Sequence, residues 1–101
     1  MVIEIFENEF DEKIKDPCIV DFYTSTCPSC VMLAPVFEKV SEDFAGEISF
    51  YKINLENAMS LAQRFSIMYV PTLIVFKDGS AAAAETGFMD EAALSEFVKN
   101  A

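Results

Sequence analysis

The sequence predicts an α/β fold with a central mixed sheet of about five strands flanked by four helices. Apolar runs of strand length alternate with stretches of helical periodicity, and a hairpin signal follows, which gives the order βαβαβα and then ββα. Alternating strands and helices favour parallel strands with right-handed crossovers, and the hairpin adds an antiparallel pair. Because 52% of the 101 residues are hydrophobic, we expect one domain over residues 1–101 with its own core.

The strands are expected where short apolar or β-branched runs lie between turn signals. Residues 18–24 form a nearly continuous apolar run, which is typical of a strand covered on both faces. Asp78-Gly79 is a hairpin signal, so the four alanines at 81–84 are expected to form a returning strand despite their helical propensity. The other expected strands cover residues 2–6, 48–54 and 72–76.

Four helices are expected from apolar residues at helical spacing. Gly46 is the expected stop of the second and longest helix. The expected capping residues of the other three are Asn8, Asn57 and Asp90, because Asn and Asp side chains accept hydrogen bonds from free N–H groups. The expected buried faces carry, from first helix to fourth, Phe10 and Ile14; Cys30, Leu33, Ala34, Phe37, Val40, Ser41 and Phe44; Ala58, Leu61, Ala62 and Phe65; and Leu94, Phe97 and Val98.

The composition limits the partners and the cellular setting. The chain has 7 Lys and Arg residues and 17 Asp and Glu residues, so its formal net charge is −10. This negative charge disfavours binding to nucleic acid or to anionic membranes. The N-terminal residues lack the basic and apolar regions of a signal peptide. The longest apolar stretch, residues 67–76, contains a proline and is too short to cross a bilayer. A cytoplasmic setting is therefore expected. We also expect a monomer.

Cys27-Pro28-Ser29-Cys30 is the most informative motif of the chain. Two of the three cysteines lie three positions apart, after an apolar run and at the start of a helical pattern. In a reducing compartment this context indicates a dithiol that exchanges electrons with disulfides. The alternatives are a pair of inert buried cysteines and a structural zinc site, which needs about four Cys or His ligands in a chain that has no His.

The position of the motif predicts different roles for its two thiols. Cys27 would occupy the helix N-cap within reach of solvent, whereas Cys30 lies one turn further on and heads the buried stripe. Pro28 falls at the first helical position, where its missing N–H has no consequence. The N–H groups of Ser29 and Cys30 would point at the Cys27 sulfur and, with the helix dipole, favour its thiolate form. Pro35 is expected to kink the helix.

A single carboxyl group interrupts the apolar run before the motif. Asp21 would be buried there with a raised pKa, and it could take the proton of Cys30 when that thiol must attack. The alternative is a solvated residue on a half-exposed strand. Lys52 interrupts a neighbouring strand and is either the partner of Asp21 or an ordinary surface lysine. Cys18, at the start of the apolar run, is expected to be a small buried apolar residue.

A set of short motifs occurs in the order and at the spacing of the thioredoxin family, which the chain resembles over nearly its whole length. These motifs are Val20-Asp21-Phe22-Tyr23, Cys27-x-x-Cys30, Ala34-Pro35, Tyr51-Lys52-Ile53-Asn54, Val70-Pro71-Thr72-Leu73, Phe76-Lys77-Asp78-Gly79 and Gly87. The resemblance implies the thioredoxin fold, with Cys27 as nucleophile and Cys30 as resolving thiol. It also implies that Asp21 is the buried acid–base group, with Lys52 beside it.

The resemblance further implies a substrate groove beside the dithiol. The Val70-Pro71 bond would be cis and face the dithiol, although cis is a minority state for X–Pro bonds. The backbone before this proline would pair with the substrate chain, and Gly87 would leave the groove open. The expected apolar docking surface comprises Thr26, Pro28, Val31, Met68, Tyr69, Val70 and Phe88, of which Met68, Tyr69 and Phe88 could instead be core residues.

The active-site turn departs from the usual family pattern. Thr26 and Tyr23 stand where thioredoxins usually carry Trp, Pro28-Ser29 replaces the usual Gly-Pro, and Val31 replaces a common basic residue. Proline after the first cysteine resembles glutaredoxins, which are less reducing, at roughly −200 to −230 mV against about −270 mV for thioredoxin. The motif therefore predicts a dithiol that is less reducing than a Gly-Pro thioredoxin and is still a reductase.

The leading functional prediction is a reductase of protein disulfides that uses no cofactor beyond its own redox-active Cys27–Cys30 disulfide. Its partners would be client proteins with disulfides and a thioredoxin reductase that restores the dithiol. The alternatives are a glutathione-coupled, glutaredoxin-like reductase and a non-catalytic thioredoxin-fold adaptor. The sequence shows no basic glutathione-binding pattern, and an intact Cys-x-x-Cys with Asp21 and Pro71 disfavours an adaptor.

Overall fold

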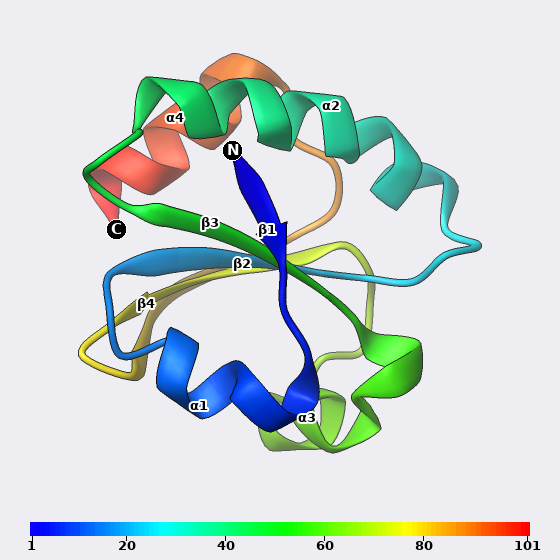
Figure 1. Ribbon diagram of the computed structural model, residues 1–101. Coiled ribbons are helices and arrows are strands. Elements are labelled where there is room, and N and C mark those ends of the chain that lie inside the picture. Colours follow the sequence, from blue (N-terminus) through cyan, green and yellow to red (C-terminus); the bar gives the residue numbers. More distant parts are fainter.

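A five-stranded sheet with helices on both faces organises the structure, a computed structural model that describes residues 1–101 (Figure 1). The strands are β1 (Val2–Glu4), β2 (Cys18–Tyr23), β3 (Ser49–Asn54), β4 (Thr72–Lys77) and β5 (Ser80–Thr86). The helices are α1 (Phe10–Lys13), α2 (Pro28–Asp43), α3 (Met59–Arg64) and α4 (Glu91–Asn100), with 3-10 turns η1 (Glu7–Glu9) and η2 (Leu55–Asn57) before α1 and α3. The predicted mixed sheet with four helices is confirmed.

The strand order is β1-β3-β2-β4-β5, so β2 lies at the centre of the sheet. Strands β1, β3 and β2 run parallel, whereas β4 is antiparallel to β2 and β5 is antiparallel to β4. The expected parallel crossover is therefore wrong for β4. With 6 residues, α3 is about 9 Å long and cannot carry the chain back along a strand of about 20 Å. Strand β4 therefore starts at the end of the sheet where β3 stops.

Each face of the sheet packs against two helices and has its own apolar core. Figure 1 shows α2 and α4 on one face and α1 and α3 on the other. In β2, Ile19 belongs to the core under α2 and α4, whereas Val20 and Phe22 belong to the opposite core. All three side chains are fully buried, so the prediction that this strand is covered on both faces is confirmed. Burial of each of these side chains contributes about 1.5–3 kcal/mol to the stability of the fold. This burial holds β2, the strand that carries Asp21, in the centre of the sheet.

Two of the four predicted helix caps are wrong. Asn8 and Asn57 lie inside η1 and η2, and neither side chain caps the helix that follows. The reason is that the chain first makes a tight 3-10 turn, so each of these helices begins after the predicted cap. Asn54 caps η2 instead, because its side chain accepts a 2.9 Å hydrogen bond from the Glu56 N–H. Asp90 is confirmed as the cap of α4, with a 2.8 Å hydrogen bond from the Ala93 N–H.

Helix α2 carries most of the predicted stripe. Ala34 and Phe44 are the exceptions: Ala34 is exposed and lines a pocket next to Asp21, whereas Phe44 follows the last helical residue and is half-buried. Pro35 lies inside the helix, which continues on both sides of it, and the kink stays a prediction. Gly46, with a φ of 84°, follows the end of the helix as expected. The buried residues of this helix are Cys30, Leu33, Phe37, Val40 and Ser41.

The strand prediction for the alanine run is confirmed. Asp78 and Gly79 have φ values of 54° and 80°, the left-handed conformation that a two-residue hairpin turn of type I′ requires. Strand β5 then pairs with β4, and the hydrogen-bond ladder outweighs the helical propensity of alanine.

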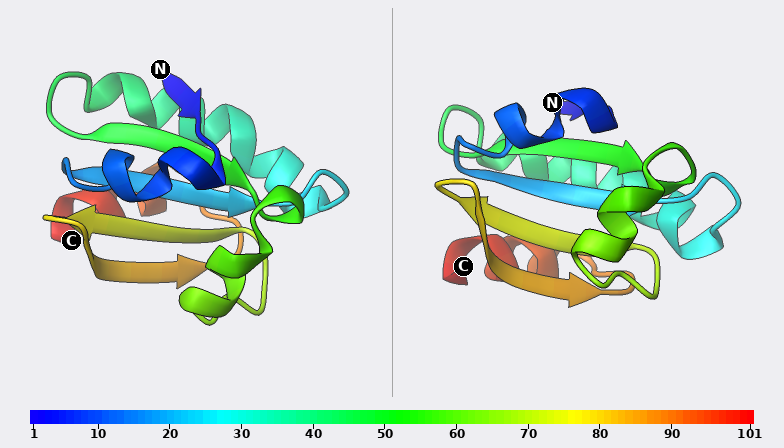
Figure 2. Two further views of the ribbon diagram at one scale, coloured as in Figure 1. Left: turned by 60° about the horizontal axis from the view of Figure 1, so that its bottom comes forward. Right: turned by 90° about the horizontal axis from the view of Figure 1, so that it is seen from below.

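Strands β2 and β3 end, and β4 begins, at the same end of the sheet. Figure 2 shows that the loop from β2 to α2, helix α3 and the segment before β4 gather there. Ligand sites in sheets of this kind lie beyond the carboxyl ends of the parallel strands. None of the helices combines the length and the apolar character needed to cross a membrane.

Candidate active site

Cys27 stands at the N-terminus of α2. Its φ and ψ of −95° and 112° are extended, and Pro28 is the first helical residue, as predicted. The Cys30 N–H donates a 3.1 Å hydrogen bond to the Cys27 Sγ. The Ser29 N–H, predicted as a second donor, makes no such bond. One backbone N–H and the helix dipole therefore face this sulfur, an arrangement that stabilises a thiolate.

The two thiols of the motif differ in exposure. Cys27 is half-buried, whereas Cys30 is only 4% exposed. Burial, and after it the hydrogen bond with the Cys27 side chain, raises the pKa of Cys30 to about 12. All the cysteines are free thiols. Cys27 is therefore the more accessible of the two thiols, and Cys30 is shielded.

The segment before β4 faces the dithiol. The Val70-Pro71 bond is cis, as the resemblance implied. The Cys27 thiol donates a 3.6 Å hydrogen bond to the Val70 carbonyl oxygen. The Gly87 N–H donates a 2.8 Å hydrogen bond to the Pro71 carbonyl oxygen, which ties the end of β5 to this segment. Gly87 has a φ of 92°, and a Cβ there would meet no atom within 4 Å, so the space beside it is open.

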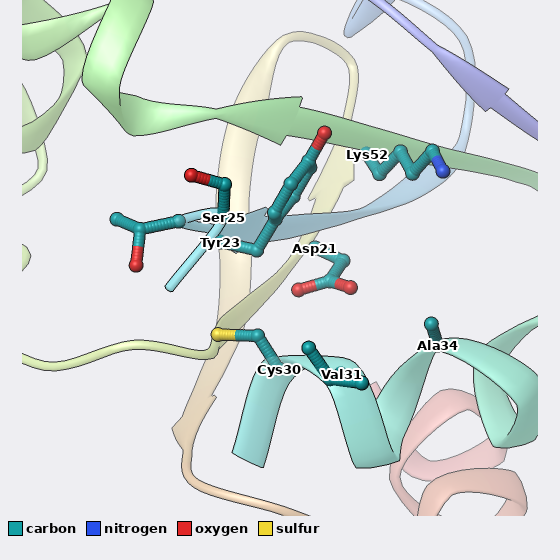
Figure 3. A pocket seen from close by; sticks show the side chains of 8 residues that line it. Asp21, Tyr23, Ser25, Cys30, Val31, Ala34 and Lys52 are labelled. Carbon is teal, nitrogen blue, oxygen red and sulfur yellow. The ribbon is translucent and has the colours of Figure 1, made fainter. Parts of the chain in front are cut away.

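Asp21 is buried in the sheet below the dithiol. It is 4% exposed, which excludes the alternative of a solvated strand residue, and its Oδ1 has no hydrogen-bond partner. Burial raises the pKa of this carboxyl to about 7, and the charge of Lys52 opposes the rise. Figure 3 shows the carboxyl group directed toward the first turn of α2. It lies in a pocket of about 210 Å³ lined by Asp21, Tyr23, Thr24, Ser25, Cys30, Val31, Ala34 and Lys52.

Lys52 is a neighbour of Asp21 but not its ion-pair partner. The two residues are paired in the register of β2 and β3, and Lys52 is half-buried. The ion pairs of the structure, Lys15–Glu12, Lys39–Glu91 and Arg64–Asp11, do not include Lys52. Its Nζ lies 5.9 Å from the centre of the Tyr23 ring. Lys52 is therefore neither a direct ion-pair partner of Asp21 nor an ordinary surface lysine. Its charge lowers the pKa of Asp21 without direct contact.

The docking candidates of the loop before β4, and Phe88 in the loop after β5, are exposed, so the alternative that they belong to the core is wrong. The exposed fractions are 83% for Met68, 71% for Tyr69 and 43% for Phe88. Met68 and Tyr69 line a hollow together with Val70, whose carbonyl faces Cys27, and with Met59. Phe88 lines a separate hollow against α4.

The active-site turn is exposed at Thr26, Pro28, Ser29 and Val31. Cys18 lies at the opposite end of β2 from the dithiol and is fully buried, as predicted. Burial raises the pKa of Cys18 to about 12, and the charge of Asp16 adds to the rise.

Sequence reasoning missed polar residues that other elements bring to the site. Glu56 accepts hydrogen bonds of 2.8 and 2.6 Å from the Ser25 N–H and hydroxyl, which lower its pKa and tether the loop before the dithiol to η2. Glu4 accepts a 2.6 Å hydrogen bond from the Tyr23 hydroxyl. No sequence signal indicated these contacts, because they join residues far apart in the chain that only the folded arrangement brings together. Met59 did have a signal, as an apolar residue beside the predicted stripe of α3.

A reachable thiol at a helix N-terminus, a shielded thiol one turn further on and a buried carboxyl group define the class of thiol–disulfide oxidoreductases. The family model described as Thioredoxin matches residues 1–100. The thioredoxin of Staphylococcus saprophyticus is 33% identical over 99 residues, which cover 97% of this chain and 95% of that protein. The thioredoxin of Staphylococcus haemolyticus is 35% identical over 96 residues, which cover 94% and 92%. The chain belongs to the thioredoxin family.

Proposed function

We propose that the protein reduces disulfide bonds of other proteins by way of a mixed disulfide. The observation that supports this most strongly is the 3.1 Å hydrogen bond from the Cys30 N–H to the Cys27 Sγ. An N–H and a helix dipole directed at one sulfur favour the thiolate, which is the attacking form. The shielded second thiol lies one helical turn away, in position to act on the same sulfur.

In the proposed reaction, the Cys27 thiolate attacks one sulfur of the client disulfide. A bond between Cys27 and the client forms, the client disulfide breaks, and the second client sulfur leaves as a thiolate that takes a proton from solvent. Asp21 then accepts the Cys30 proton, and the Cys30 sulfur attacks Cys27. The Cys27–Cys30 disulfide forms, the mixed disulfide breaks, and the client leaves with both sulfurs reduced.

Asp21 and Cys30 are suited to this proton transfer. A carboxyl whose pKa is about 7 exchanges protons near neutral pH, where a general base is most effective. Cys30 lines the same pocket of about 210 Å³, which has room for water to carry the proton between the two groups. Lys52 lines the pocket as well and favours the ionised form of Asp21 after the transfer.

We propose that the client chain lies extended along Val70 during the reaction. The Val70 carbonyl oxygen is 3.6 Å from the Cys27 Sγ and so lies next to the place where the client sulfur arrives. The Gly87 N–H donates a hydrogen bond to the Pro71 carbonyl oxygen of this segment, and the exposed Met68 and Tyr69 supply apolar contact to the client. Phe88, Thr26, Pro28 and Val31 extend the docking surface.

The proposal includes the partners and the setting of a thioredoxin. Client proteins with disulfides supply the oxidant, and a thioredoxin reductase returns the electrons to the Cys27–Cys30 disulfide. The bacterial proteins that resemble this chain are named thioredoxins, which supports these partners. A dithiol of this kind works where thiols are kept reduced, so we propose a cytoplasmic monomer that acts as one domain.

The test is reduction of insulin with dithiothreitol as electron source. The wild type should accelerate it, Cys27→Ser should abolish the acceleration, and Cys18→Ala, the matched cysteine control, should retain it. A wild type that does not accelerate the reaction would favour the adaptor. Activity with glutathione as sole reductant would favour the glutaredoxin-like alternative, and metal analysis of the purified protein tests the zinc alternative.

A further inference from the structure

Three charged side chains form a row across the parallel strands beside the Asp21 pocket. Glu4 of β1 is paired in register with Lys52 of β3, and Lys52 is paired with Asp21 of β2. Paired residues of neighbouring strands project from the same face of a sheet, so Lys52 stands between two carboxyl groups. It is within ion-pair distance of neither, since the ion pairs of the structure involve other residues.

Tyr23 lies beside two members of this row, Glu4 and Lys52. It follows Asp21 by two positions in β2 and therefore lies on the same face of the sheet. Its hydroxyl donates a 2.6 Å hydrogen bond to Glu4 Oε2, and its ring centre lies 5.9 Å from the Lys52 Nζ. A cation at that distance from a ring face is weakly attracted. Figure 3 shows that the Lys52 side chain does not point toward the Asp21 carboxyl group.

We propose that Glu4 and Tyr23 are positioning residues that set the pH range in which Asp21 serves the resolving step, by controlling where the Lys52 ammonium group lies. The inference rests on the proposed function, in which Asp21 takes the Cys30 proton. While the Tyr23 hydroxyl occupies Glu4, Lys52 forms no ion pair with Glu4, and its charge favours the ionised form of Asp21. When Glu4 loses this donor, it attracts Lys52, and Asp21 keeps its proton to higher pH.

The other groups around Asp21 do not supply this control. Helix α2 presents the thiols of Cys27 and Cys30, which carry no positive charge in either protonation state. The partner of Asp21 on β4 is the apolar Leu73. Glu56 of η2 is engaged by the loop before the dithiol. Lys52 is the only cation that lines the pocket, so its position decides the electrostatic stabilisation of the Asp21 carboxylate.

The test is the titration of the Asp21 carboxyl carbon by carbon-13 NMR in the reduced protein, with the signal assigned by its loss in Asp21→Asn. Glu4→Gln keeps an acceptor for the Tyr23 hydroxyl and removes the competing charge, so the midpoint should fall. Tyr23→Phe keeps the ring and frees Glu4, so the midpoint should rise. Each shift should be about half a pH unit, as expected for one partly screened charge. The pH profile of disulfide reduction should move in the same directions.

Glu47→Gln is the matched control, because it removes one negative charge at an exposed position in the turn before β3. Midpoints that move in the same direction in both variants, or by no more than in this control, would overturn the inference. The titration does not require turnover, so its result is independent of the proposed function. If the wild type had no reductase activity, the proposed function would be refuted. The titration would still test whether Glu4 and Tyr23 control the effect of Lys52 on Asp21.

Discussion

Replacement of Asp21 by asparagine should stabilise the protein at alkaline pH and change its stability much less at acid pH. Burial, opposed by Lys52, raises the pKa of this carboxyl from 3.8 to about 7. A carboxyl group whose pKa rises on folding stabilises the native state through its bound proton. This contribution is present in full below the unfolded pKa and is lost as the pH rises through the native pKa. At about 1.4 kcal/mol for each pKa unit, the loss approaches roughly 4 kcal/mol above pH 7.

The assay is urea unfolding of the reduced wild type and of Asp21→Asn at several pH values. The difference in the free energy of unfolding should grow in favour of the variant by roughly 2–4 kcal/mol between about pH 4 and pH 8. The buried amide of Asn changes the free energy of unfolding by an amount that does not vary with pH. The informative quantity is therefore the change of the difference between variant and wild type with pH. Glu47→Gln, which is exposed, should show no comparable slope. A difference that does not vary with pH, or that favours the wild type as the pH rises, would refute the reasoning.

Three further predictions concern the cap, the docking surface and the redox poise. Asp90→Ala should lower the free energy of unfolding by about 1 kcal/mol in guanidinium titrations. Asp90→Asn should lower it much less, because Asn also caps helices. Equal losses in the two variants would contradict the role of Asp90 as a cap. Met68→Ser should raise the KM for a protein disulfide several-fold with little change in kcat, and unchanged kinetics would remove this residue from the docking surface. The double substitution Pro28→Gly with Ser29→Pro should lower the potential, measured by alkylation after equilibration in glutathione buffers. A wild-type potential at or below about −270 mV would contradict the assignment of a less reducing turn.

The features of the site that lie close together in the chain could be predicted from the sequence. The spacing of Cys27 and Cys30 and the position of Pro28 depend only on where α2 begins, and the apolar run before them marks that start. The burial of Asp21 followed from the same run, because a strand with apolar residues on both faces leaves a polar side chain no exposed face. The alanine strand followed from its hairpin turn, which local propensity alone contradicted.

The features that depend on distant contacts could not be predicted. Asn8 and Asn57 have suitable cap chemistry, but the 3-10 turns before α1 and α3 move each helix start beyond them. The direction of β4 depends on the length of α3, and the ends of a short helix are poorly marked by periodicity. The contact between Tyr23 and Glu4 spans β3 and requires the register of three strands.

The most direct test of the central claim, that Cys27 attacks and Cys30 resolves, is to stop the reaction between the two steps. Cys30→Ser removes the resolving thiol, so a client with a disulfide should remain covalently joined to Cys27. Mass spectrometry of the digested adduct should identify one linkage at Cys27, and Cys27→Ser should trap no client. A client joined to Cys18, or no trapped client where the wild type reduces it, would contradict the account.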